Sequence, residues 1–244
     1  MTQQYLCFDI ETTSLDWELF SESQQEYLLR GLTTDEEIEK RKWELALTPM
    51  TASVVCIGLM LMQKSDDGSW EVISKAALST KLGYTTEERR EIELSTGDRL
   101  FLATEEKIIE DFWKILSKYP ASVLVSFNGR NFDCPFLMLR SAIHNIRPSR
   151  NLMAGTKFNY PSHIDLADEL TFYAGFGFGA TKRFNFDFYA RSFGITSPKS
   201  EGVDGSKVNQ LYLDGHIEEI AEYCLRDVTA TWDLFLKWNN YLRF

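Results

Sequence analysis

QYLCFDIETTSLD, residues 4–16, alternates apolar strand-forming residues with two carboxylates near its middle. Side chains two apart along a β-strand share a face, so Asp9 and Glu11 project together, opposite the even-numbered apolar residues (Leu6, Phe8 and Ile10). Burying a carboxylate is costly unless a partner compensates for it. The stretch predicts an opening strand that packs one face on a core and gathers negative charge on the other.

Length and composition indicate a globular chain. The 244 residues, 44% of them hydrophobic, are enough for one large domain, and we expect a single domain over residues 1–244. No run of about 18 apolar residues occurs, and the start lacks a secretion signal, so we expect neither membrane insertion nor secretion. The cysteines, at positions 7, 56, 134 and 224, form no CxxC pair. Reduced buried thiols in a cytoplasmic protein are the simpler interpretation.

Periodicity along the rest of the chain predicts an α/β fold, with helices on the faces of a mixed sheet. Apolar runs at 53–62 and 69–76, joined by SDDG, read as a hairpin that makes three antiparallel strands with the first. Helical stripes follow Thr104, which we expect to open with a capping box, and cover 135–146 and 217–238, with a buried strand at 122–127. Residues 17–50 read as a mostly helical, acidic insert with a capping box from Thr34 to Glu37. Residues 79–100 read only as a polar stretch.

Two further motifs carry acids. In SFNGRNFDCPFL, residues 126–137, Asp133 stands where a strand ends and a helix with Pro135 in its first turn begins. A simple helix N-cap is the alternative interpretation. In the last helix, Tyr223 and Asp227 are four residues apart and therefore share a face. A partly buried tyrosine with a polar tip is the alternative there.

Each pattern is common alone, but the three occur in a characteristic order. D-x-E on the first strand, N-x-x-x-F-D after a later strand and Y-x-x-x-D on the last helix resemble the DEDD family of 3′-to-5′ exonucleases, tyrosine subtype. The stretch from Val203 to Phe235, with HIDLADEL, is similar to stand-alone predicted 3′-to-5′ exonucleases related to the proofreading domain of B-family DNA polymerases. The resemblance implies a ribonuclease H-like fold. Carried over by position, it implies metal-binding carboxylates at Asp9, Glu11, Asp133 and Asp227, and a water-orienting tyrosine at Tyr223.

The resemblance also implies cofactors and substrate contacts. Oxygen ligands suit Mg²⁺ or Mn²⁺, and two such ions would activate a water and stabilise the leaving 3′ oxygen. Substrate contacts fall on the backbone near Thr12 and Thr13, and on Asn128 and Phe132. Ser14 follows the two threonines, where many relatives have glycine.

Residues 171–195 interleave aromatic and basic residues, which suits stacking of bases, although most of these aromatics also suit a core. Within them we expect the glycine-rich stretch 174–180 to form a mobile lip. His163 beside Asp165 has the residue types of a metal pair, but its apolar neighbours favour a buried structural segment.

The charge of the chain is polarised. Its net charge is −10, yet residues 128–199 hold nine basic and five acidic residues, a local charge of +4. Bound cations would also offset the acids where a phosphate docks, so a nucleic-acid partner is compatible with this balance. We therefore expect hydrolysis at the 3′ end of nucleic acid, in the first place single-stranded DNA, releasing nucleoside 5′-monophosphates. RNA hydrolysis and a non-catalytic nucleic-acid-binding module of the same fold are the alternatives.

Overall fold

The computed structural model describes residues 3–85, 88–174, 177–197, 205 and 207–243. Seven strands within these ranges form one sheet: β1 (Gln4–Ser14), β2 (Ala52–Lys64), β3 (Trp70–Ser79), β4 (Arg90–Glu93), β5 (Arg99–Leu102), β6 (Val123–Ser126) and β7 (His163–Asp165). The α-helices are α1 (Glu22–Leu28), α2 (Asp35–Glu44), α3 (Glu105–Lys118), α4 (Asp133–Ile143), α5 (Leu166–Glu169), α6 (Phe186–Ser192), α7 (Val208–Leu213) and α8 (Ile217–Tyr241). Two short 3₁₀ helices, η1 (Trp17–Leu19) and η2 (Leu45–Leu47), flank α1 and α2.

The sheet has the strand order β4-β5-β3-β2-β1-β6-β7. The strand β2 is antiparallel to both of its neighbours, β1 and β3, while β6 runs parallel to β1 and β7 runs parallel to β6. On the other side, β5 is parallel to β3 and pairs with an antiparallel edge strand, β4. The prediction of a mixed sheet in an α/β fold is confirmed, as is the antiparallel hairpin after the first strand.

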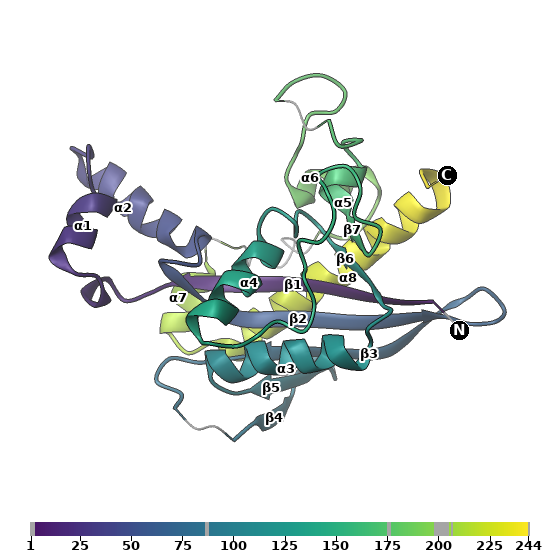
Figure 1. Ribbon diagram of the computed structural model, residues 1–244, viewed down its shortest axis with the longest axis horizontal. Coiled ribbons are helices and arrows are strands. Elements are labelled where there is room, and N and C mark those ends of the chain that lie inside the picture. The colour runs from purple at the N-terminus through teal and green to yellow at the C-terminus, as the bar shows by residue number, and fades with distance from the viewer. Residues whose placement is uncertain (1–2, 86–87, 175–176, 198–204, 206, 244) are drawn as a thin grey trace.

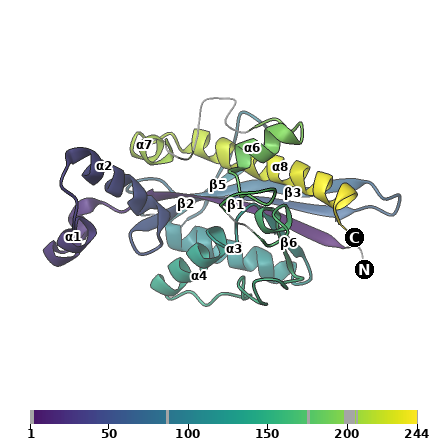
Figure 2. The ribbon, with the colours of Figure 1, turned by 90° about the horizontal axis from the view of Figure 1, so that it is seen from above.

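Helices cover both faces of the sheet, with α3 and α4 on one side and α6, α7 and α8 on the other (Figures 1 and 2). The apolar stripe of α3, including Phe112 and Leu116, packs with Leu6 and Phe8 of β1. The long helix α8 spans the opposite face of the sheet, and its apolar stripe is buried there from Ile217 to Trp238. Each face of β1 therefore packs against one layer of helices: the face of Leu6 and Phe8 is in the core as predicted, and the face of Asp9 and Glu11 is largely buried as well.

Residues 17–50 form an arm that projects beyond the Ser14 end of β1 (Figure 1). Thr34 and Glu37 form the predicted capping box of α2. The base of the arm is fixed by the buried Arg140 of α4, which donates to Pro49 O at 3.2 Å and forms an ion pair with Glu105. Glu105 in turn accepts from the amide of Val54, at 2.8 Å. The arm thus leaves from a rigid part of the sheet.

The structure differs from the sequence prediction at residues 79–100 and at Thr104. The polar stretch 79–100 contains β4, the whole interval that follows it and the first two residues of β5, and the sequence pattern missed both strands. The capping box expected at Thr104 is wrong, because the position that must accept is Lys107, a cation; Thr104 Oγ1 alone accepts, from the Lys107 amide at 3.3 Å. Residues 175 and 176 of the glycine-rich stretch lie outside the described residues. No helix in the described ranges is long and apolar enough to cross a membrane.

Candidate active site

The two acids of β1 face helix α8. Their neighbours on that face, Tyr5 and Cys7, belong to the apolar cluster beneath α8. Asp9 is partly exposed and Glu11 is buried. In the pairing with β2, Asp9 lies opposite Gly58, and the register shifts by one residue directly after Glu11. Such a bulge redirects the strand and is common beside functional sites.

Helix α8 reaches these acids because Gly58 has no side chain. A Cβ atom at position 58 would lie 2.8 Å from Cys224 Sγ and 3.2 Å from Cys224 O. Isolated glycines within strands often mark such a close approach. Cys224 lies between Tyr223 and Asp227 along the helix, and its thiol donates to Asp9 O at 3.5 Å. The close packing at Gly58 therefore sets the position of both predicted α8 site residues over β1.

Asp133 is the first residue of α4 and joins the cluster through β1. Phe132 occupies the N-cap position without a side-chain cap bond, so the simple interpretation of Asp133 as a helix cap is wrong. Instead, the buried Asp133 carboxylate accepts from the Ile10 amide, through Oδ1 at 3.0 Å. Ile10 stands between Asp9 and Glu11, so this hydrogen bond ties the third acid to the first two.

A cavity of about 130 Å³ opens at the cluster. It is lined by residues from β1, from the loops after β6 and α6, and from α6 and α8: Asp9, Phe127, Phe186, Asp187, Ser197, Tyr223, Asp227 and Thr231. Asp187 is an acid that sequence reasoning did not single out. It pairs with Arg191 at 2.9 Å and accepts from the Ser197 hydroxyl, so its charge is compensated locally.

Burial and mutual repulsion both act on the acids. Burial raises the pKa of Asp9 well above its usual range, and the charges of Asp133, Asp227 and Glu11 raise it further. The pKa of Glu11 is raised in the same way, with Asp227 the leading charge. Burial also raises the pKa of Asp133 to about 7, although the Ile10 hydrogen bond opposes the shift. The cluster cannot hold all its negative charges without a compensating cation.

The donor set fits a hard divalent cation. Ligand atoms of Asp9, Glu11 and Cys224 all lie within 4.8 Å of one another. Burial raises the pKa of the Cys224 thiol, so this residue stays protonated and is a poor ligand. The carboxylate oxygens that remain are the ligands that Mg²⁺ and Mn²⁺ prefer. Sequence reasoning missed Cys224, which carries no motif signal beyond its place after Tyr223.

Tyr223 is buried beside the acids, at 5% exposure. Burial, the charges of Asp227, Glu11 and Asp9, and a side-chain hydrogen bond with Asp227 all raise its pKa above the usual value near 10. The phenol is therefore protonated at neutral pH and can donate a hydrogen bond but cannot act as a base.

The residues predicted to contact substrate have defined partners. Thr12 donates to Ala46 O at 2.7 Å, and Thr13 donates to Asn209, which ties the end of β1 to the arm and to α7. Asn128 has a left-handed backbone, with φ 63°, and its side chain accepts from Arg183 at 2.9 Å. Phe132 is half-buried and packs on Phe136 in the core.

His163 and Asp165 support the loop before α4. The Asp165 carboxylate accepts from the amides of Asn128 and Arg130, at 2.8 and 2.9 Å. His163 is buried, and burial lowers its pKa to about 3, so it is neutral and bonds Ser126 Oγ at 2.8 Å. Both contacts agree with the structural interpretation of this segment.

Comparison with known proteins gives a family and a fold. A family described as "Predicted 3'-5' exonuclease related to the exonuclease domain of PolB" matches residues 72–242, which include Asp133, Tyr223 and Asp227. Asp9, Glu11 and the arm precede the matched range. No curated protein matches the chain.

Among solved structures, the chain is similar to the family B DNA polymerase from the hyperthermophilic archaeon Pyrobaculum calidifontis. The TM-score is 0.51 at 20% sequence identity, over 97% of this chain and 24% of the polymerase. The chain thus spans about a quarter of that protein. At this identity the likeness concerns the fold, and it confirms the predicted ribonuclease H-like sheet.

Proposed function

Because the chain belongs to the family of predicted 3′-to-5′ exonucleases related to the exonuclease domain of PolB, we propose that it hydrolyses phosphodiester bonds at the 3′ end of single-stranded DNA. The observation that carries this proposal is the electrostatic cluster of Asp9, Glu11, Asp133 and Asp227, drawn from β1, α4 and α8. Nothing in a purely structural role requires four carboxylates that repel one another, two of which, Asp9 and Asp227, line a cavity.

Exonuclease domains of this kind generally use divalent metals. We propose that two ions, Mg²⁺ or Mn²⁺, would be held by the carboxylates of Asp9, Glu11, Asp133 and Asp227, with Asp9 at the centre of the set. When bound, such ions activate a water and stabilise the leaving 3′ oxygen. The carboxylates in turn depend on the cations, whose charge restores the ionised forms that burial and repulsion disfavour.

The proposed role of Tyr223 is to orient water by hydrogen bonding. Its raised pKa keeps the proton on the phenol, which donates a hydrogen bond to the Asp227 carboxylate, so the hydroxyl oxygen would orient a water by accepting a hydrogen bond from it. Asn128 and the amides near Thr12 and Thr13 are proposed to position the terminal nucleotide. The release of nucleoside 5′-monophosphates follows if water attacks the phosphorus of the last internucleotide bond.

The decisive experiment uses 5′-labelled single-stranded DNA, duplex DNA and RNA, each with Mg²⁺, Mn²⁺ or EDTA. We expect a ladder that shortens from the 3′ end of single-stranded DNA and disappears in EDTA and in the Asp9→Ala and Asp227→Ala variants. Faster shortening of RNA would replace the DNA assignment by the RNA alternative. Hydrolysis that survives in both variants would remove the carboxylate cluster from the mechanism.

A further inference from the structure

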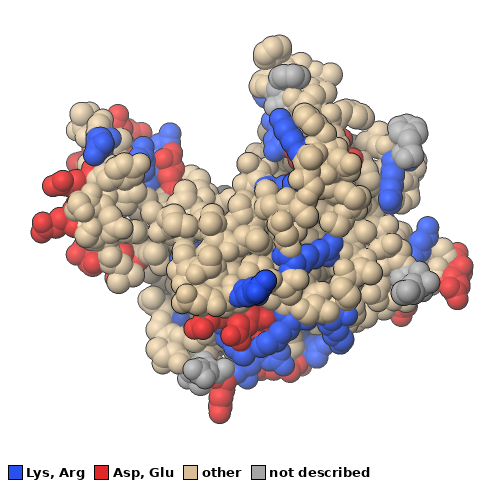
Figure 3. All heavy atoms as spheres, in the orientation of Figure 1, with Lys and Arg blue, Asp and Glu red and all other residues tan. Residues whose placement is uncertain are grey.

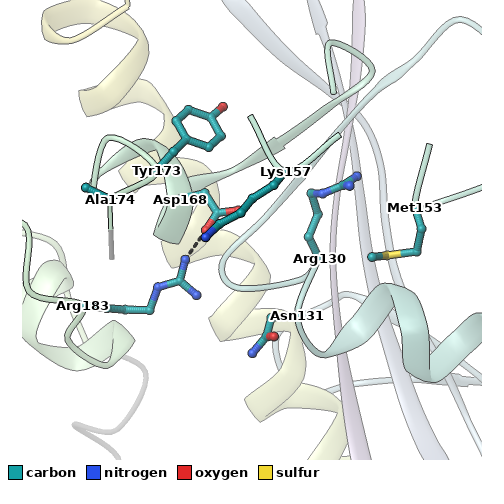
Figure 4. A pocket seen from close by; sticks show the side chains of 8 residues that line it. All are labelled: Arg130, Asn131, Met153, Lys157, Asp168, Tyr173, Ala174 and Arg183. Atoms are coloured by element: carbon teal, nitrogen blue, oxygen red, sulfur yellow. Dashed lines mark hydrogen bonds and ion pairs between the residues drawn. The ribbon is translucent and has the colours of Figure 1, made fainter. Parts of the chain in front are cut away.

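A second, larger cavity lies on the other side of the loop that carries Asn128. Its volume is about 520 Å³, and the residues that line it are Arg130, Asn131, Met153, Lys157, Asp168, Tyr173, Ala174 and Arg183 (Figure 4). Phe127 lines the small cavity at the carboxylates, whereas Arg130 and Asn131 line this one. The loop 127–131 therefore contributes residues to both cavities.

The lining of the larger cavity has an excess of positive charge. Three cations, Arg130, Lys157 and Arg183, face one acid, Asp168, among the described residues that line it. That acid is already engaged, because it pairs with Arg183 and accepts from the Tyr160 hydroxyl at 2.8 Å. Figure 4 shows Lys157 and Arg183 directed toward the same part of the cavity.

The other two cations, Arg130 and Lys157, form no ion pair among the described residues. Arg130 stacks over the Tyr160 ring, 3.9 Å from its centroid, and donates to the carbonyl of Ala154 at 3.2 Å; both partners are neutral. Lys157 is exposed, and no ion pair involving it occurs among the described residues. Its amino group lies 5.4 Å from the centroid of the Phe158 ring. The cavity therefore has cations in excess of its acids, which suits a polyanion.

Arg183 connects this cavity to the candidate active site. One of its guanidinium nitrogens donates to the Asn128 side chain, at 2.9 Å, while another pairs with Asp168. Its Nε is buried without a hydrogen-bond partner. The Arg183 guanidinium could therefore contact a ligand in the cavity while it holds the side chain of Asn128, which is proposed to contact the terminal nucleotide.

We propose that this cavity binds backbone phosphates of the substrate strand on the 5′ side of the bond being cleaved. The inference rests on the proposed exonuclease function, since a strand whose 3′ end lies at the carboxylates must continue in the 5′ direction over a neighbouring surface. Lys157 and Arg130 contact the phosphates, and Arg183 couples their binding to the position of Asn128. Aromatic rings beside the cavity, including the exposed Phe158 and Phe172, are available for stacking.

The test uses Lys157→Gln, which removes one charge from an exposed side chain that the fold does not need. Lys64→Gln is the matched control: Lys64 is also exposed and lies 5.6 Å from an aromatic centroid, that of Trp70, but lines neither cavity. Two substrates are compared, a single-stranded 12-mer and the p-nitrophenyl ester of thymidine 5′-monophosphate. The ester has no 5′ neighbour and reports only on the carboxylate site.

For the 12-mer, we expect Lys157→Gln to raise KM by about threefold to tenfold, with kcat unchanged. The slope of log affinity against log salt, measured by fluorescence anisotropy in EDTA, should become shallower by about 0.7, the value for one phosphate contact on a single strand. Hydrolysis of the ester should be unchanged in both variants. Lys64→Gln should match the wild type throughout.

The outcomes separate the two proposals. A wild-type protein that cleaves neither substrate contradicts the exonuclease function itself. Normal cleavage of both substrates, with identical KM and salt slope in Lys157→Gln, overturns the strand site alone. If inorganic phosphate or thymidine monophosphate binds the wild type at micromolar concentration, and Lys157→Gln abolishes that binding without affecting the 12-mer, the cavity is a site for free phosphate and the strand assignment is wrong.

Discussion

The close packing of α8 on Gly58 makes Gly58→Ala a sensitive test of the candidate site. The new Cβ would lie 2.8 Å from Cys224 Sγ, 3.0 Å from Val228 Cγ2 and 3.2 Å from Cys224 O. All three distances are shorter than ordinary van der Waals separations, and one involves the helix backbone. Rotating a side chain therefore cannot remove the clash, and α8 must move outward by a few tenths of an ångström or more.

The displacement should affect stability and catalysis together. Overpacking a core typically costs about 1–3 kcal/mol, and each kcal/mol lowers Tm by roughly 2–4 °C in a chain of this size. Gly58 lies opposite Asp9, so the same movement separates the α8 residues Tyr223 and Asp227 from the β1 acids. Misplacement by about 1 Å can cost ~10²-fold in rate. For a displacement of a few tenths of an ångström, we expect kcat on single-stranded DNA to fall by about 3- to 10-fold.

Two further variants control this experiment. Gly177→Ala makes the same substitution where an added Cβ meets nothing within 4 Å, and it should leave Tm and kcat near their wild-type values. The double variant Gly58→Ala/Cys224→Ala removes the shortest contact, so it should recover part of the lost stability relative to the sum of the single variants. Unchanged Tm and kcat in Gly58→Ala would refute the argument that this contact positions α8.

Three other predictions concern single side chains. Since the pKa of Asp133 in the folded state is raised to about 7, its carboxylate opposes folding increasingly as pH rises from about 4 to 7. In EDTA, the Tm of Asp133→Asn relative to that of the wild type should therefore rise over this pH range. A constant difference in Tm would contradict the raised pKa. Tyr223→Phe should lower kcat about tenfold to a hundredfold, as expected for a positioning hydroxyl, while Mn²⁺ affinity measured by calorimetry stays unchanged. Glu105→Ala leaves the buried Arg140 guanidinium unpaired and should cost about 3–5 kcal/mol in urea unfolding, whereas Glu110→Ala, on the exposed face of the same helix, should cost less than about 1 kcal/mol.

Elements with strong periodicity could be predicted from the sequence. The stripe of α8 and the alternation of β1 each record which side chains face the core, and the structure buries those faces. The strand β4, Arg90–Glu93, carries no such record, since only Ile92 among its four residues is apolar. An edge strand of this kind exists because β5 offers unpaired backbone groups beside it. Its formation depends on tertiary structure, which local sequence does not encode.

Some residues of the candidate site could likewise be predicted from the sequence, and others could not. The acids and Tyr223 could be singled out as candidates because three motifs, each common alone, occur in a characteristic order. Sequence reasoning passed over Gly58, although an isolated glycine within an apolar strand is a recognised sign of close backbone approach. Arg183 and Asp165 act through loops that meet only in the fold, where one bonds the side chain of Asn128 and the other its amide. The spacing of these residues in the sequence does not predict such contacts.

The acidic net charge is compatible with a nucleic-acid substrate because the acidic and basic residues lie in different parts of the fold. Many of the acids lie on the arm, where residues 17–50 hold eight acidic and four basic residues, while the cavity behind Asn128 has more cations than acids. Figure 3 shows acidic side chains on the arm, with some basic ones among them, and mainly basic side chains on the part of the molecule that faces the arm across a hollow. A nucleic-acid strand contacts only one face of a protein. Interactions between exposed charges more than about 10 Å apart are largely screened at moderate salt. The local electrostatic potential, and not the net charge of −10, therefore determines where a polyanion can bind. Repulsion by the acidic arm favours a path of the nucleic acid over the cavity lined by Arg130, Lys157 and Arg183.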